Sequence, residues 1–139
     1  MKKICLPLLL LVVCQVGFAQ SKPEEKVPEK RVSNAFDIIK ENEKTNSSYG
    51  VFMRNPSISS GVYTLKKGAT DEQHPHSRDE IYYIIKGKAK IKVGTENYDV
   101  TEGSLVFVEA FKEHRFFDIT EDLAVVVFFS AEQGAPKKK

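Results

Sequence analysis

The chain has 139 residues, of which 21 are basic and 19 acidic, so its formal net charge at pH 7 is +2. Only the three C-terminal lysines form a basic run, and this excludes the electrostatic footprint of a nucleic-acid-binding protein. The length suffices for one domain with a hydrophobic core but not for two. Both cysteines, Cys5 and Cys14, precede residue 20, so the rest of the chain has no thiol chemistry or disulfide.

The first segment, residues 1–19, has the pattern of a signal peptide. Two lysines precede a mostly apolar run over residues 4–16, which is too short for a stable membrane span, and small residues lead up to Ala19. We expect cleavage after Ala19, export to the periplasm or outside the cell, and no stable membrane insertion of the mature protein. Two alternatives remain open: a retained membrane anchor, and lipidation at Cys14, although Val13 stands where a small residue is expected.

Residues 20–48 are expected to form a linker and one short helix. Residues 20–33 are rich in Lys, Glu and Pro, a composition typical of a flexible spacer. Asn34 is a favourable N-cap, and a helix with Phe36 and Ile39 on one face is expected to end near Lys44.

From Tyr49 onward, short β-rich runs alternate with turn residues. No helix of useful length is expected between them, so the pattern predicts an all-β sandwich or barrel over residues 49–130. Residues 131–139 are expected to form a flexible basic tail. The expected strands cover residues 49–54, 60–65, 81–86, 89–93, 98–100, 104–108, 114–118 and 124–130.

All three histidines fall within one 41-residue window, and a glutamate lies close by. In an extended strand, residues two apart face the same side, so His74 and His76 are expected to point together. Glu80 opens the next strand and can point back to them, and His114 arrives from a distant strand. Imidazole nitrogen and carboxylate oxygen form a ligand set that divalent transition metals prefer.

Strand parity extends this expectation to the walls of the site. If Glu80 faces inward, so do Tyr82 and Ile84, and at most one of the two adjacent tyrosines, Tyr82 and Tyr83, reaches a cavity. Arg54 and Arg78 could meet an anionic substrate or lie solvated on the surface. Five aromatic residues are expected to pack in the core rather than form a substrate cage: Tyr63, Tyr82, Phe107, Phe116 and Phe128.

The segment from Gly68 to Gly87 resembles the first motif of the cupin superfamily: glycine, five residues, His-x-His, three residues, glutamate, six residues, glycine. The second motif is matched in part, by Gly103 and His114. Three substitutions depart from it, because Glu109, Phe111 and Asp118 replace the usual proline, glycine and asparagine. The resemblance covers residues 49–130. The 15 residues between Gly87 and Gly103 are similar to the short spacing between the two motifs in compact single-domain cupins.

This resemblance implies an all-β double-stranded β-helix, a jelly-roll barrel, preceded by the short helix. It implies a divalent metal (Mn, Fe, Ni, Co or Zn) bound by His74, His76, Glu80 and His114, and a homodimer. Glu80 could also act as a catalytic base. The function expected first is that of a metal-dependent, dioxygenase-like oxidoreductase acting on a small anionic or enolic molecule. A metal-dependent isomerase or lyase, and a non-catalytic cupin that binds a metal or small ligand, remain open.

Overall fold

The structure, a computed structural model, describes residues 31–134. The predicted signal peptide, most of the spacer and the last lysines lie outside these residues. Helix α1 (Ala35–Thr45) begins as expected, because the Asn34 side chain accepts a hydrogen bond from the Phe36 amide at 2.9 Å. Of the two residues expected on one face, Ile39 is buried against the sheet, whereas Phe36 is exposed.

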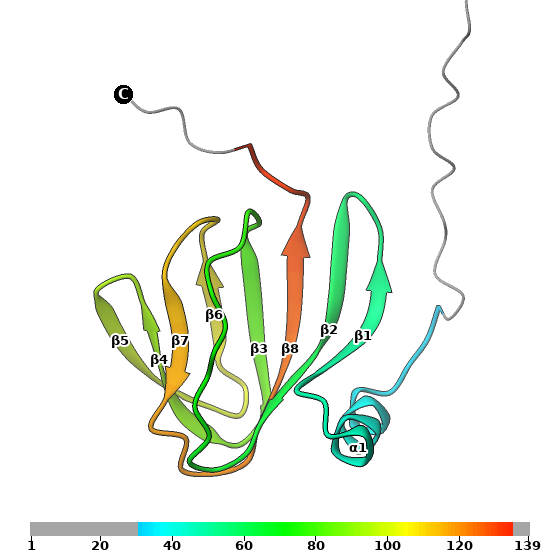
Figure 1. Cartoon of the computed structure of the whole chain (residues 1–139), viewed down its shortest axis with the longest axis vertical. Helices are drawn as coiled ribbons and strands as arrows, with labels where there is room; N and C mark the ends of the chain where they lie inside the picture. Colours follow the sequence, from blue (N-terminus) through cyan, green and yellow to red (C-terminus); the bar gives the residue numbers. More distant parts are fainter. Residues whose placement is uncertain (1–30, 135–139) are drawn as a thin grey trace, which may run out of the picture.

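The strands predicted from residue 49 onward are confirmed, each with ends within two residues of the expected ones. They form a five-stranded antiparallel sheet in the order β1-β2-β8-β3-β6 and a three-stranded sheet in the order β5-β4-β7 (Figure 1). This arrangement is the expected jelly-roll sandwich. The strands are β1 (Tyr49–Arg54), β2 (Ile58–Leu65), β3 (Glu80–Lys86), β4 (Lys88–Val93), β5 (Glu96–Thr101), β6 (Leu105–Val108), β7 (His114–Phe117) and β8 (Leu123–Ser130).

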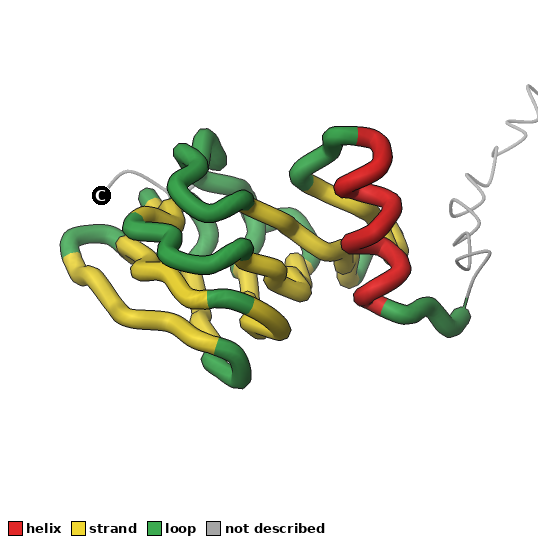
Figure 2. Tube along the Cα trace, turned by 90° about the horizontal axis from the view of Figure 1, so that it is seen from below, coloured by secondary structure: helices red, strands yellow, loops and turns green. Residues whose placement is uncertain are grey.

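The hydrophobic core lies between the two sheets. Side chains from the inner faces of both sheets meet there, and their removal from water supplies the main favourable free energy of folding. The helix lies outside this sandwich, against the end of the larger sheet (Figure 2). The buried core residues are Leu65, Tyr82, Ile84, Ala89, Ile91, Val100, Val108, Phe116, Ile119, Leu123, Val125 and Val127.

Strand β3 confirms the predicted parity. Glu80, Tyr82 and Ile84 are buried on the inner face, whereas Ile81 and Tyr83 are 47% and 41% exposed on the outer face. Two of the five aromatic residues expected in the core are therefore misplaced by the prediction. Phe107 and Phe128 lie on the exposed face as the cross-strand partners of Ile81, and the residues of one pair share a face.

Helix α1 covers part of that outer face. Ile39 packs against Val62 of β2 and Ala124 of β8, and the Asn42 side chain donates to the Val62 carbonyl at 3.2 Å. The helix approaches β1 so closely that a Cβ atom at Gly50 would lie 2.5 Å from the Asn42 side chain. Within residues 31–134, no helix has the length and apolar character needed to cross a membrane.

Candidate metal centre

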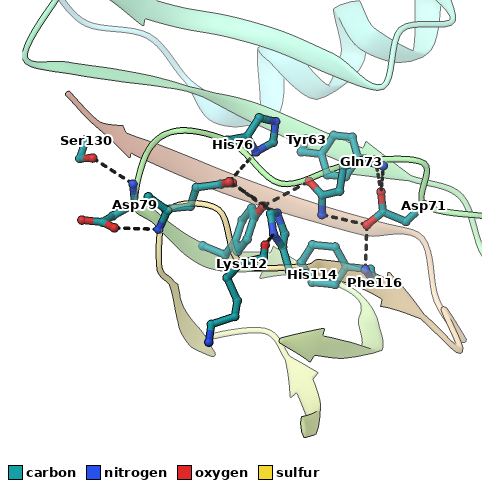
Figure 3. Close-up of polar contacts among 12 residues, drawn as sticks. Tyr63, Asp71, Gln73, His76, Asp79, Lys112, His114, Phe116 and Ser130 are labelled. Carbon is teal, nitrogen blue, oxygen red and sulfur yellow. Dashed lines mark hydrogen bonds and ion pairs between the residues drawn. The ribbon is translucent and has the colours of Figure 1, made fainter. Parts of the chain in front are cut away.

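Three of the four predicted ligands converge at the inner side of the sandwich. Glu80 begins β3, His114 begins β7, and His76 lies in the connection between β2 and β3. His76 Nδ1 is 2.5 Å and His114 Nε2 is 3.5 Å from Glu80 Oε1. One potential ligand atom from each residue lies within 4.8 Å of the other two. Figure 3 shows the two histidines of this group, His76 and His114, within one network of polar contacts. Strands distant in the sequence thus bring a histidine and a carboxylate to one place.

The tautomer of His114 follows from its surroundings. Its Nδ1 lies 2.8 Å from the backbone carbonyl of Lys112, and a carbonyl oxygen can only accept, so Nδ1 carries the hydrogen. In the neutral imidazole, Nε2 then presents a lone pair toward Glu80 and Tyr82. In metal-binding histidines, the ring nitrogen that does not bind the metal commonly donates such a hydrogen bond, which orients the ring.

One hydroxyl, that of Tyr82, is shared among three acceptors at the centre of this cluster. The Tyr82 hydroxyl lies 2.5 Å from Glu80 Oε2, 3.0 Å from His114 Nε2 and 3.2 Å from Gln73 Oε1. All three are acceptors when Glu80 is ionised, and one hydroxyl carries one proton. A cation would satisfy the lone pairs left without a donor. The donor set, two imidazoles and one carboxylate, therefore fits a divalent transition metal.

Two groups of the cluster have shifted pKa values. The hydrogen bond to Glu80 raises the pKa of His76 above its ordinary value of 6.5, although partial burial opposes the shift. Burial, followed by the negative charge of Glu80, raises the pKa of Tyr82 far above 10.0. The Tyr82 hydroxyl therefore stays protonated and acts as a donor.

The fourth predicted ligand, His74, does not lie in the cluster. It is exposed, and its Nδ1 lies 3.0 Å from the Glu72 carbonyl. The expectation that His74 and His76 point together assumed an extended strand, but residues 66–79 form a connection without strand pairing. Because the Glu72 carbonyl holds Nδ1 of His74 as a donor, Nε2 remains available as a ligand atom. Metal binding by His74 stays a prediction.

Two residues that support the cluster, Asp71 and Gln73, were not predicted from the sequence. Asp71 is buried and accepts from the Tyr63 hydroxyl at 2.7 Å, the Phe116 amide at 2.7 Å, and the amide and side chain of Gln73. Because the Gln73 Nε2 group donates to Asp71, its oxygen faces Tyr82. Both residues lie inside the first cupin motif, but the motif does not specify the residue type at their positions, so it did not single them out.

The departures from the second motif leave the backbone geometry intact. Phe111 and Asp118 have φ values of 63° and 46°, in the left-handed region that glycine and asparagine adopt most readily. The Phe111 amide donates to the His76 carbonyl at 2.7 Å, which ties the turn before His114 to the connection that carries His76. Asp79 adds a second tie by accepting from the Ala110 amide at 2.9 Å.

A cavity of about 660 Å³ opens beside the cluster. It combines aromatic walls, two arginines and three residues of the cluster's network, Gln73, His76 and Tyr82. Such a mixture of apolar surface and a few polar groups is typical of small-molecule sites. Its lining residues are Tyr49, Arg54, Asn55, Pro56, Ser59, Tyr63, Gln73, His76, Ser77, Arg78, Tyr82, Val127, Phe129 and Glu132.

Comparison with known proteins agrees with this geometry. The family described as Cupin domain matches residues 61–130. The chain belongs to this family. An uncharacterized protein from Streptomyces coelicolor is 43% identical over 98 residues, which cover 70% of this chain and 93% of that protein.

Solved structures share the cupin fold at low sequence identity. TT1209 from Thermus thermophilus has a TM-score of 0.61 at 17% identity, covering 73% of this chain and 98% of that one. KdgF from Halomonas sp. has a TM-score of 0.55 at 19% identity, with 61% and 78% covered. A structure described as FeII HppE has a TM-score of 0.51 at 17% identity, with 58% and 48% covered. These likenesses show the fold alone.

Proposed function

We propose that this cupin is a small exported metal-dependent oxidoreductase, dioxygenase-like, that acts on a small anionic or enolic substrate. The observation that carries the proposal is the convergence of His76, Glu80 and His114 beside a cavity large enough for a small molecule. The description of a structure of similar fold as FeII HppE is consistent with iron as the ion.

The protein's own residues would hold the ion and orient the substrate. His76, Glu80 and His114 would bind it, with His74 as the fourth ligand after movement of its loop. A bound divalent ion with open positions supplies Lewis acidity and a place for oxygen ligands. Tyr82 donates to Glu80 Oε2 and fixes that carboxylate. Glu80 lies behind the cavity lining, next to His76 and Tyr82, and would serve as a catalytic base after moving toward a substrate hydroxyl.

Oxygen consumption tests the reaction. The full chain, loaded in turn with Fe(II), Mn(II), Co(II), Ni(II) and Zn(II), is offered a panel of enolic and phenolic acids in an oxygen electrode. We expect uptake with at least one redox-active ion and its loss in His76→Ala, while Glu72→Gln, which alters an exposed side chain near His74, keeps it. Turnover without oxygen uptake would instead indicate an isomerase or lyase. Tight binding without any turnover would indicate a non-catalytic cupin.

We also propose that the mature protein forms a homodimer, as its resemblance to other cupins implies. The uncovered apolar side chains on β3, β6 and β8 lie next to the free edge of β6, so a second copy could pack against both. Sizing chromatography with light scattering should give twice the chain mass. A monomer at all concentrations would refute the dimer.

The proposal of export rests on the leader sequence alone. Expression of the full gene in its own host, followed by fractionation and mass spectrometry, should recover a chain that begins after Ala19. A cytoplasmic protein with its first residues intact would contradict the proposal, and a lipid on Cys14 would replace it by a lipoprotein.

A further inference from the structure

The inner wall of the cavity carries an arginine that simple strand parity would place elsewhere. Tyr49 of β1 pairs with Tyr63 of β2, and both line the cavity. The register then shifts between Val51 and Met53, so Arg54 pairs with Ser59 and lies on the same wall as Tyr49. Alternation alone would put residues 49 and 54 on opposite faces, and a β-bulge of this kind redirects a side chain.

A second arginine reaches the same end of the cavity. Arg78 Nη1 donates to Ser59 Oγ at 2.8 Å, and Ser59 is the cross-strand partner of Arg54. Arg78 Nη2 lies 3.4 Å from Glu132 Oε1, a long contact with a side chain that is 72% exposed. The Glu132 carboxylate thus contacts the Arg78 guanidinium from the solvent side. A bound carboxylate that makes shorter hydrogen bonds to Arg78 could displace Glu132.

Gly61 of β2 leaves room for the side chain of Tyr49. A Cβ atom at Gly61 would lie 2.5 Å from the Tyr49 hydroxyl oxygen, so only glycine lets that ring lie across β2. Within residues 31–134, no side chain hydrogen-bonds this hydroxyl. Burial raises the pKa of Tyr49 above its ordinary value; Glu80 adds to this shift, and Arg54 and Arg78 oppose it. A half-buried hydroxyl donor on the same cavity lining as two guanidinium groups is suited to an oxyanion.

We propose that Arg54, Arg78 and Tyr49 form a carboxylate-binding subsite, and that the cavity takes small carboxylates with a planar apolar body. Guanidinium forks match a carboxylate with two parallel hydrogen bonds. Phe129 and Val127, on the adjacent strand, supply the apolar wall for the body. The two arginines exceed Glu132, the one carboxylate on the cavity lining, by one positive charge. The inference rests on the proposed function only in taking the bound carboxylate as a substrate.

Titration calorimetry on the full chain tests the subsite with benzoate, its neutral analogue benzamide, and phenylphosphonate. We expect benzoate to bind, benzamide to bind roughly tenfold more weakly, and phenylphosphonate to bind no tighter than benzoate. Arg54→Met should weaken benzoate roughly tenfold or more without affecting benzamide. Arg54→Lys should recover part of the loss, and Arg31→Met, which removes the same charge from an exposed position outside the cavity, should change nothing.

Running each titration with chelated and with zinc-loaded protein separates this inference from the proposed function. Binding that depends on Arg54 in both states supports the subsite, even if no oxygen uptake is found. Binding that appears only with zinc and ignores Arg54 places the carboxylate on the ion, which overturns the subsite and leaves the proposed function standing. Absence of benzoate binding, equal affinity for benzamide, or tighter binding of phenylphosphonate would each also overturn it.

Discussion

His74 and His114 have the same local hydrogen bond but lie in different surroundings. In each, Nδ1 lies close to the carbonyl two residues earlier, at 3.0 Å for His74 and 2.8 Å for His114. His114 is 3% exposed and faces Glu80 from a paired strand, whereas His74 is exposed on an unpaired connection. The local contact sets the tautomer, but the sheet decides whether the free nitrogen reaches the cluster.

The two strand-borne ligands and His76 of the connection are therefore preformed, whereas His74 of the same connection is not in place. Glu80 and His114 open strands of opposite sheets and are held by buried neighbours. His74 could join them only if residues near it moved. Substitutions of residues on the strands and on the connection test this difference.

Removal of the buried carboxylate should have the largest effect. Glu80→Gln keeps the shape but removes the charge and one ligand oxygen, so the affinity for Zn(II) or Mn(II) should fall by about a hundredfold or more. Titration calorimetry measures the loss. Glu72→Gln alters an exposed carboxylate beside His74 and should bind normally. Normal binding by Glu80→Gln would place the ion elsewhere.

The two histidines compared above should differ in the same assay. His114→Ala should lower metal affinity by about a hundredfold or more, and His74→Ala by about tenfold or less, because only His114 lies in the preformed cluster. Equal losses would show that His74 is an equal ligand after rearrangement. The four-ligand prediction would then hold, and the contrast between strand and connection would fail.

The support of the connection can be tested without metal. Asp71→Asn replaces an oxygen that faces buried donors with an amide that cannot satisfy them all, so the free energy of unfolding of chelated protein should fall by about 2 kcal/mol. Urea denaturation measures the change, and Asp99→Asn, at an exposed position, serves as the control. Equal stability of both variants would mean that Asp71 does not anchor the connection.

The smallest effect is expected where Asp122, between β7 and β8, contacts the start of the same connection. The Lys67 amide and then Lys66 lower the pKa of Asp122 below its ordinary 3.8, so its charge stabilises the fold above that pH. This contribution is lost as the pH falls through the lowered pKa. Asp122→Asn should cost less than about 1 kcal/mol near neutrality, because solvent screens the group. Thermal melts of wild type and variant should converge as the pH falls further below 3.8, and a constant gap would contradict the assignment.

The sequence predicted the strands well because short β-rich runs and turn residues are local signals. Parity along β3 also followed from one assumption, that Glu80 faces inward, and this placed Tyr82 and Ile84 correctly. The cluster of His76, Glu80 and His114 was predicted because the cupin motif encodes which strands meet.

What failed depended on pairing between segments. Phe107 and Phe128 were wrongly assigned to the core, because the sequence of one strand does not reveal which residues it pairs with on the next. Both residues pair with the exposed Ile81. The parallel presentation of His74 and His76 failed because the connection has no partner strand to hold it extended. Asp71 and Gln73 gained their roles only from contacts across the fold.

Anomalous diffraction from crystals soaked in Mn(II) tests the central claim most directly. We predict a peak within about 2.0–2.3 Å of an imidazole nitrogen of His76, an oxygen of Glu80 and Nε2 of His114, with the ion lost in Glu80→Gln. No peak at these three residues in well-ordered, chelator-free crystals, or a peak only at another place, would contradict the assignment of the metal centre.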